Sequence, residues 1–542
     1  MDSESGGTTW LFSSSFPENQ IDPYRMSFQA RIRRLASETA VYGVSSIVGR
    51  LINFLLFPLY SHVFLPSEYD PIVLIYAAFM FLNILYQHGM ESSYLKFATD
   101  RNELSGRSRA FGTAVISLGG LSVLLSTVMY FAKTPTGLLI GLDESNLYLL
   151  NFAALILLLD ALSVVPFADL RLRNKPWVFA GIRIANIVVN VGLNLVFIFV
   201  LDMGILSILL ANVAASGLSL LLLIPTIQSR FARVDSGLWK KMILFGLPFV
   251  PGGIGYAMTE RINLFFLAEM DPDIVIRLYD MTPQSHPDLY ALAAEQGPMV
   301  FTQHIVGTYG GMIKLAVLMA LFVQMFRYAW QPFFLQRQKD HDAPELFGKV
   351  FAVLTLILTS AYLGISFFAE EIVRFPVPGN RTLIASSYWM GLSIIPVALI
   401  GYVFQGWYYH FSAGAYIKNQ SKYFLHATAM GSITALVINA WFVPTGGMIA
   451  AAAATSAAYA VMAIVLFFLI RPHYPLPYNW VRTIGVILLA GGTFWFWSAQ
   501  ATLQVWWAEL GIVIGYALIA STLLGIPVTR VRSLLGQRAS SE

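Results

Sequence analysis

The sequence has no cysteine and little charge. Without cysteine the chain can form no disulfide, no thiolate metal site and no cysteine nucleophile. Asp, Glu, Lys and Arg together make up only 12% of the 542 residues, whereas soluble domains carry about 25%. This composition excludes an ordinary soluble domain. The net charge of +4 indicates little until its distribution along the chain is considered.

Several sequence motifs are also missing. The pattern GxxxxGK[ST] does not occur, so no ATP site within the chain is expected to drive its activity. The histidines do not cluster at metal-ligand spacing, and no catalytic constellation is recognisable, so we expect neither a metal nor a cofactor nor an enzyme. Residues 1–30 contain no apolar core of a signal peptide. Nothing indicates a nucleic-acid partner.

Long apolar runs dominate what is present. The chain is 57% hydrophobic, with a mean hydropathy of +0.65, and a helix needs about 20 apolar residues to cross a bilayer. The sequence predicts an all-α polytopic membrane protein with 14 transmembrane helices. The predicted spans are 38–64, 71–96, 109–131, 147–169, 177–200, 204–227, 241–268, 305–335, 349–372, 383–409, 421–442, 446–470, 481–499 and 505–526.

The basic residues indicate an orientation. If the N-terminus is cytoplasmic, most Lys and Arg fall in cytoplasmic segments, and the outer loops hold only Lys133, Arg277, Arg374 and Arg381. Because basic loops stay on the cytoplasmic side, both termini are predicted to be cytoplasmic.

Two halves of the chain resemble each other. At a constant offset of 245, Arg173 matches Lys418, Asn174 matches Asn419 and Asn194 matches Asn439. Spans 1–6 and 7–12 are therefore predicted to be two six-helix parallel-repeat lobes enclosing a cleft, with spans 13 and 14 as an appended C-terminal pair. The predicted divisions are a cytoplasmic polar tail at 1–36, an N-lobe at 37–230, a C-lobe at 231–470, the appended pair at 471–528 and a cytoplasmic basic tail at 529–542.

The C-lobe is interrupted by a long acidic segment, residues 269–304, which we call the insertion. It holds six acidic residues and one base, Arg277. It is either a solvated external loop or a flap over the outer mouth of a pathway, and the sequence does not decide between these alternatives.

Charged side chains inside the spans point to a wet interior, because charge is costly in lipid. Arg50 and Arg261 are predicted to line the cleft. Lys314 and Arg327 either do the same or reach the interface, and Arg183 is expected to reach the interface because it lies near its helix end.

Amide stripes add to this pattern. Arg183, Asn186, Asn190 and Asn194 share one helix face, as do Gln324 and Arg327. The amides either bind a substrate or hydrogen-bond neighbouring helices. The carboxylates Glu91, Asp160 and Glu260 are fewer than the bases within the spans, so the interior is predicted to be positive and to receive an anionic, phosphorylated substrate.

The segments ETAVYGVSSIVGRLINFLLFPLYSHVFLPSEYD, YQHGMESSYLKF and FGLPFVPGGIGYAMTERINLFFL resemble bacterial oligosaccharide flippases, the polysaccharide biosynthesis proteins of the multidrug/oligosaccharidyl-lipid/polysaccharide exporter superfamily. The resemblance covers about residues 36–470. It implies a multi-pass protein of the bacterial inner membrane that flips an undecaprenyl-diphosphate-linked oligosaccharide. Membrane lipids, a glycan polymerase and glycosyltransferases are its implied partners.

In that interpretation, the diphosphate would meet Arg50, Arg261, Lys314 and Arg327, and the amides would bind the sugar. H⁺, Na⁺ or the membrane potential would supply the energy through Glu91, Asp160 or Glu260. The alternatives are a cation-coupled multidrug exporter of the same fold and, less favoured, a membrane enzyme that polymerises or transfers glycans.

Overall fold

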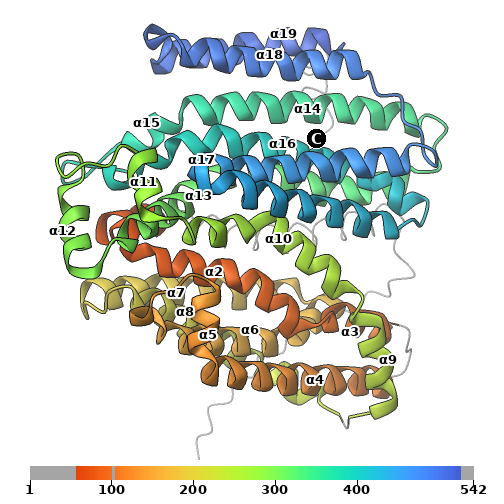
Figure 1. Cartoon of the computed structure of the whole chain (residues 1–542). Helices are drawn as coiled ribbons and strands as arrows, with labels where there is room; N and C mark the ends of the chain where they lie inside the picture. The colour runs from red at the N-terminus through yellow and green to blue at the C-terminus, as the bar shows by residue number, and fades with distance from the viewer. Residues whose placement is uncertain (1–55, 100–103, 233, 527–542) are drawn as a thin grey trace, which may run out of the picture.

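The computed structural model describes residues 56–99, 104–232 and 234–526 (Figure 1). Twelve helices in these ranges are long and apolar enough to cross a membrane. The all-α membrane fold is thus confirmed, while the count of 14 spans and the division into two lobes stay predictions. Most of the first predicted span, including Arg50, and both predicted tails lie outside the described residues.

The long helices correspond to the predicted spans, with ends that shift by up to about six residues; the exception is α16, which begins and ends well after the predicted 383–409. They are α2 Pro66–Gln87, α3 Met90–Thr99, α4 Leu104–Phe131, α6 Leu149–Leu172, α7 Pro176–Phe199, α8 Leu206–Arg230, α9 Ser236–Gly246, α10 Phe249–Ala268, α13 Met299–Arg337, α14 Ala343–Phe367, α16 Ile394–Ile417, α17 Lys422–Ile470, α18 Trp480–Ser498 and α19 Trp506–Leu523.

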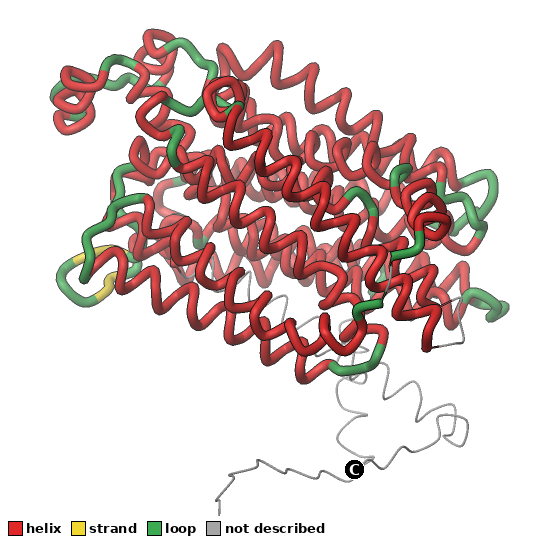
Figure 2. The backbone as a smooth tube through the Cα atoms, turned by 90° about the horizontal axis from the view of Figure 1, so that it is seen from below, coloured by secondary structure: helices red, strands yellow, loops and turns green. Residues whose placement is uncertain are grey.

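Short elements connect them at the ends of the bundle. They are α5 Lys133–Leu139, η2 Glu144–Asn146, α11 Pro272–Leu278, α12 Pro287–Gln296, α15 Ala369–Arg374, the hairpin β1 Pro376–Val377 and β2 Arg381–Thr382, η3 Ser386–Ser393 and η4 Ala501–Leu503. Figure 2 shows the long helices running side by side, with the loops and the hairpin gathered at two ends. We call the end that carries α11 and α12 the insertion end and the end that carries α9 the opposite end.

Backbone breaks divide two of the predicted spans and mark the junction of two others. The second predicted span is broken between α2 and α3, where His88 and Gly89 have φ of 33° and 72°. The seventh is broken between α9 and α10. The eleventh and twelfth spans form one helix, α17, which is interrupted at Gly447 with φ 54° and ψ −136°. A side chain at this φ is strained, so glycine suits the kink.

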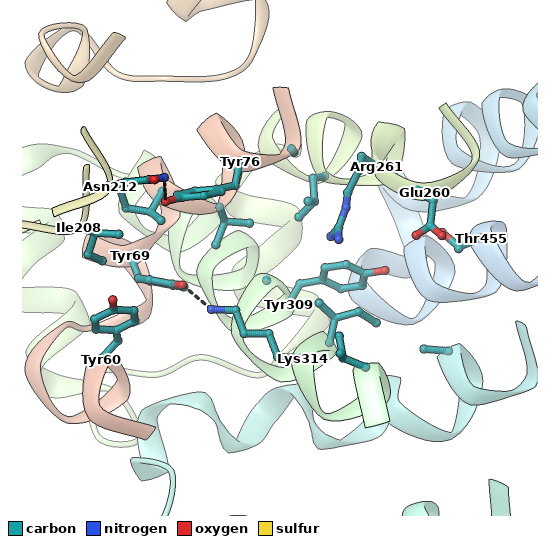
Figure 3. A pocket seen from close by; sticks show the side chains of 18 of the residues that line it. Tyr60, Tyr69, Tyr76, Ile208, Asn212, Glu260, Arg261, Tyr309, Lys314 and Thr455 are labelled. Carbon is teal, nitrogen blue, oxygen red and sulfur yellow. Dashed lines mark hydrogen bonds between the residues drawn. The ribbon is translucent and has the colours of Figure 1, made fainter. Parts of the chain in front are cut away.

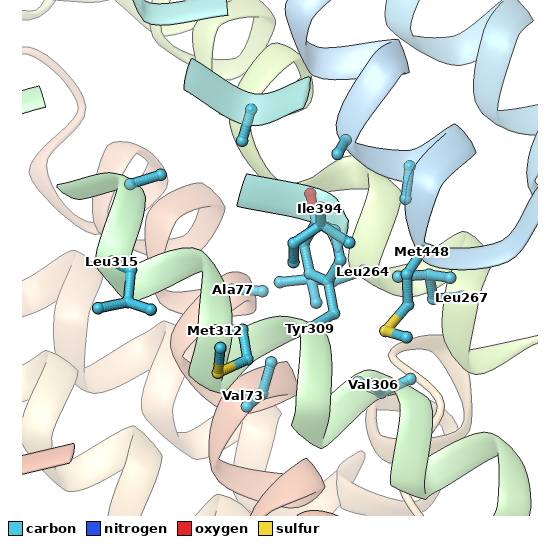
Figure 4. Packing of buried hydrophobic residues seen from close by; sticks show 14 of the residues in the cluster. Val73, Ala77, Leu264, Leu267, Val306, Tyr309, Met312, Leu315, Ile394 and Met448 are labelled. Atoms are coloured by element: carbon cyan, nitrogen blue, oxygen red, sulfur yellow. The ribbon is translucent and has the colours of Figure 1, made fainter. Parts of the chain in front are cut away.

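The two halves of the chain meet along α2 and α13, which lie against each other through a seam of small residues. A Cβ atom at Gly307 would overlap the carbonyl oxygen of Pro66, and one at Gly310 would overlap Val73. Glycine lets helix backbones approach closely in membranes. Figure 4 shows the buried core beside this seam, where α2, α10, α13, α16 and α17 converge.

The insertion is folded. Both α11 and α12 pack against α13, and α11 also packs against α17. The Thr302 hydroxyl donates to the Met270 carbonyl at 3.0 Å, and the Tyr290 and Phe301 rings lie 4.9 Å apart. The segment is therefore folded against the insertion end of the bundle and is not a free solvated loop. That it acts as a flap over the mouth of a pathway stays a prediction.

The last two helices form the edge of the molecule. Helices α18 and α19 pack against each other and against α14 (Figure 1). Their outward side chains, such as Val481 and Trp495, are exposed, as expected for helices that face lipid.

Candidate functional site

A cavity of about 730 Å³ lies at the centre of the bundle (Figure 3). We call it the central cavity. Its walls come from α2, α7, α8, α10, α13, α16 and α17, and from Tyr60 in the helical segment before α2. Because both halves of the chain contribute, the cavity must change shape whenever these helices move relative to one another.

The charge around the central cavity is predominantly positive. Among the described lining residues, Arg183, Arg261 and Lys314 are cationic, and Glu260 is the one carboxylate. Such a surface attracts anions.

Lys314 is held by aromatic side chains. Its Nζ donates to the Tyr69 hydroxyl at 2.5 Å, and lies 4.8 Å from the Phe57 ring centre and 4.9 Å from that of Tyr69. These contacts fix the ammonium group at the cavity wall instead of at a membrane interface. The predicted lining position of Lys314 is thus observed, although its role in binding stays a prediction.

Glu260 and Arg261 both line the cavity although they are neighbours in α10. Figure 3 shows their side chains diverging, as expected for adjacent helical residues about 100° apart. The Tyr256 hydroxyl donates to Glu260 at 3.0 Å, and Gln405 Nε2 lies 3.4 Å from the same oxygen. Gln405 also donates to the Tyr459 hydroxyl at 2.7 Å. Glu260 therefore belongs to a polar network joining α10, α16 and α17.

The polar stripe on α7 is only partly turned into the cavity. Arg183, Asn186 and Asn190 line it. Asn194 is fully buried, and its Oδ1 accepts a hydrogen bond from the Tyr60 hydroxyl at 3.0 Å. Arg183 differs from expectation: its guanidinium lies 4.3 Å from the Phe167 ring centre and faces the cavity instead of the interface.

Four further predicted site residues do not line the central cavity. Arg327 stacks 4.9 Å from the Tyr409 ring centre, and Gln324 donates to the Tyr328 hydroxyl at 2.7 Å. Asp160 accepts from Ser216 at 2.7 Å, and Glu91 pairs with Arg171 near the opposite end. Of the three carboxylates predicted as ion carriers, Glu260 is the one that lines the cavity.

The sequence analysis missed the tyrosines. Six line the central cavity, together with Asn212 and Thr455: Tyr60, Tyr69, Tyr76, Tyr309, Tyr402 and Tyr459. Asn212 donates to Tyr76 at 2.8 Å and Asn263 donates to Tyr309 at 2.6 Å, so two of these hydroxyls are held in place. Ring faces beside hydroxyls suit sugars and other amphipathic ligands. These tyrosines could not be recognised from the sequence, because a tyrosine within an apolar run does not stand out as polar.

This architecture is similar to the folds of several membrane transporters of known structure. The lipid II flippase MurJ in an inward closed conformation aligns with a TM-score of 0.69, covering 89% of this chain and 98% of its own, at 13% identity. An inward-facing multidrug resistance MATE family transporter of the MOP superfamily aligns with a TM-score of 0.59, covering 78% and 94%, at 15% identity. The MATE multidrug transporter DinF-BH aligns at 0.51, covering 84% and 99%, at 16% identity.

At the level of sequence, no protein-family profile and no curated protein matches the chain. The likeness to these solved structures is one of fold, and at that level it supports the predicted resemblance to the exporter superfamily.

Proposed function

We propose that the chain is a flippase that moves a polyprenyl-diphosphate-linked saccharide across a membrane by alternating access. The observation that carries the proposal is the central cavity, with three cationic side chains and one carboxylate among its described lining residues. A diphosphate gains from such a surface because guanidinium and ammonium groups donate to several phosphate oxygens at once. The similar fold of a lipid II flippase supports the same class of substrate.

The cavity suits each part of this lipid. Arg183, Arg261 and Lys314 would hold the diphosphate, and Asn186, Asn190 and the tyrosines would contact the sugar. We place the protein in the bacterial inner membrane with the insertion end outward and both termini in the cytoplasm, as the basic loops predict. Glycosyltransferases that build the lipid-linked sugar and a polymerase that extends it would act before and after this step.

Glu260 is the proposed coupling group. It is the described carboxylate that lines the cavity, and its hydrogen bonds to Tyr256 and Gln405 link three helices. Gaining or losing H⁺ or Na⁺ at this position would change the contacts between these helices, which a coupled transport cycle requires.

A cation-coupled multidrug exporter is the alternative, favoured by the tyrosine-rich wall and by the MATE transporters of similar fold. The two functions differ in the charge of what they carry. In liposomes containing the purified chain, a fluorescent polyprenyl-diphosphate disaccharide should cross and the cationic dye rhodamine 6G should not.

Removing single positive charges tests the role of the central cavity. Arg261→Gln and Lys314→Gln should each abolish lipid translocation, whereas Lys349→Gln, on an exposed i,i+4 ion pair with Glu345, should not. Transport of the dye with no movement of the lipid would establish the alternative.

A further inference from the structure

A second cavity, of about 400 Å³, lies at the insertion end. We call it the insertion-end cavity. Its walls come from α2 and the helical segment before it, the loop between α5 and η2, η2, the end of α7, the turn between α7 and α8, α12 and α13. Three residues of the insertion, Leu292, Gln296 and Gln303, form part of this wall, so the insertion builds a cavity instead of merely covering the end of the bundle.

The two cavities are arranged along the same three helices. On α2, Ser67 lines the insertion-end cavity and Tyr69 the central one; on α13, Gln303 and Lys314 divide in the same way. Helix α7 also lines both cavities, with Ile198 at the insertion-end cavity and Asn190 at the central one. The cavities therefore follow one another along a common axis.

A partition separates them. Tyr60 lines the central cavity and Phe64, one turn later, lines the insertion-end cavity. The Tyr60 hydroxyl donates to Asn194, which lies on α7 between the stretches that line the two cavities. The Tyr60 and Tyr69 ring centres are 6.1 Å apart. We call this contact set the tyrosine partition.

The chemistry of the insertion-end cavity is opposite to that of the central one. Its polar lining consists of three carboxylates, three amides and two hydroxyls: Glu68, Asp143, Asp202, Asn146, Gln296, Gln303, Ser67 and Ser145. None of the described lining residues is Lys, Arg or His. Phosphate is repelled by such a surface, whereas neutral hydroxyl groups donate to carboxylates and both donate to and accept from amides.

Buried polar groups at this cavity lack partners within the part of the chain that the structure describes. Ser67, which lines the cavity, is only 7% exposed and its Oγ has no hydrogen-bond partner. Asp70, one turn along α2, does not line the cavity, but it is 2% exposed and its Oδ1 is likewise without a partner among the described residues. Buried polar groups are normally satisfied, so a ligand rich in hydroxyl groups has unmet hydrogen bonds to complete here.

A metal ion fits less well. Among the described residues, no three His, Asp or Glu side chains converge as metal ligands. Asp143 already accepts from Gln303, and Glu68 Oε2 accepts from the Leu65 amide at 2.8 Å. Dispersed carboxylates interleaved with amides and one aromatic ring, Phe64, form the surface that saccharides prefer.

We propose that the insertion-end cavity is a saccharide-binding exit site, in which the sugar of the translocated lipid is received while its diphosphate stays in the central cavity. The proposal rests on the proposed function. The sugar passes the tyrosine partition before the diphosphate does. The acidic insertion-end cavity repels the diphosphate, so that group stays in the positive central cavity while the sugar moves ahead of it.

The absence of cysteine makes a direct test possible, since a single introduced thiol reports on one position. Ser145→Cys, on the exposed rim, reports the insertion-end cavity, and Thr455→Cys reports the central one. The full chain in nanodiscs is labelled with a polar maleimide, in the presence of a short polyprenyl diphosphate carrying a disaccharide or of the same lipid without sugar.

Both lipids should protect Thr455→Cys, and only the sugar-bearing lipid should protect Ser145→Cys. At a lipid concentration ten times its Kd, protection should slow labelling about tenfold, because roughly a tenth of the sites remain free. Protection of Ser145→Cys by both lipids or by neither, with Thr455→Cys protected, overturns the exit site and leaves the proposed function standing. Failure of both lipids to protect Thr455→Cys overturns both.

A matched pair of variants on α12 links the effect to the insertion. Gln296→Ala should weaken saccharide-dependent protection of Ser145→Cys about three- to tenfold, as expected for the loss of one hydrogen bond. Glu295→Gln, on the neighbouring exposed side chain that does not line the cavity, should leave it unchanged. Equal protection in the two variants would contradict the assignment of Gln296 to the site.

Discussion

The Tyr279 hydroxyl accepts a hydrogen bond of 2.8 Å from the backbone amide of Met448, 169 positions away. Met448 follows Gly447, where the helical geometry of α17 is interrupted. Tyr279 follows α11 of the insertion and packs so closely that a Cβ atom on Gly447 would overlap its hydroxyl. The insertion thus supplies the acceptor for an amide at the kink of a helix that lines the central cavity.

Removing this hydroxyl should destabilise the protein. Tyr279→Phe leaves the Met448 amide without its partner, which costs about 1–3 kcal/mol for a buried group. Burial raises the pKa of Tyr279 above its usual value of 10.0, so the hydroxyl stays neutral and the loss should be equal at pH 6 and pH 9. Thermal unfolding measures it, with Tyr148→Phe, at a 42% exposed tyrosine, as the control. An unchanged midpoint would show that the amide finds another partner.

The seam between α2 and α13 should tolerate no side chain at Gly307. In Gly307→Ala the new methyl group meets the Pro66 carbonyl oxygen, which belongs to the backbone and cannot rotate away. We expect the loss of several kcal/mol of stability or separation of the two helices. Gly192→Ala on α7 meets nothing within 4 Å and should stabilise by about 0.4–1 kcal/mol. The pair is compared by thermal unfolding, and equal midpoints would contradict the observed packing.

The tyrosine partition should limit passage from the insertion end. Tyr60→Phe removes the hydrogen bond to Asn194, so a membrane-impermeant maleimide added at that end should label Thr455→Cys more rapidly. Tyr76→Phe breaks a comparable bond to Asn212 within the central cavity and should leave the labelling rate unchanged. If both variants behave like the parent, the barrier lies elsewhere.

Two arginines should differ in their importance for binding a diphosphate. Arg183 lines the central cavity and Arg327 does not. Arg183→Gln should weaken binding of farnesyl diphosphate about 10- to 100-fold, the effect of losing one charge-assisted hydrogen bond, and Arg327→Gln should change it little. Equilibrium binding of farnesyl diphosphate to the purified chain tests this. A larger loss of affinity in Arg327→Gln than in Arg183→Gln would favour the contact between Arg327 and the diphosphate that the sequence predicts.

The coupling carboxylate should be Glu260. Glu260→Gln removes the charge from the cavity network and should abolish the dependence of transport on an ion gradient. Glu91 is a partly exposed partner of Arg171, with 35% and 37% of the side chains accessible, and such pairs contribute about 0–1 kcal/mol. Glu91→Gln should therefore retain both stability and coupling. Loss of coupling in Glu91→Gln alone would reassign the role.

The sequence predicted the spans because bilayer crossing requires a length of apolar helix that can be counted. It predicted less of the site, because depth and helix rotation depend on packing. Asn186 and Asn190 share a helix face and both line the cavity, whereas Asn194, on the same face, is covered by Tyr60. Lys314 and Arg327 are both on α13, but 13 residues of helix separate them by about 20 Å.

Other features were invisible for different reasons. Tyrosine within an apolar run looks like lipid-facing surface, so the six cavity tyrosines carried no signal. Arg183 lies near the end of α7, where a long side chain could reach water, whereas in the structure its guanidinium packs on the Phe167 and Phe179 rings and lines the cavity. The folding of the insertion depends on contacts with α13, which it runs into, and with α17, which is distant in sequence.

Because α2, α7 and α13 each form a wall of both cavities, a tilt of any one of them alters two compartments at once. A ligand that favours one tilt when it binds in one compartment changes the affinity of the other, and thermodynamic reciprocity makes the effect equal in both directions. A molecule bound at the insertion end would then raise or lower the affinity of the central cavity for its own ligand.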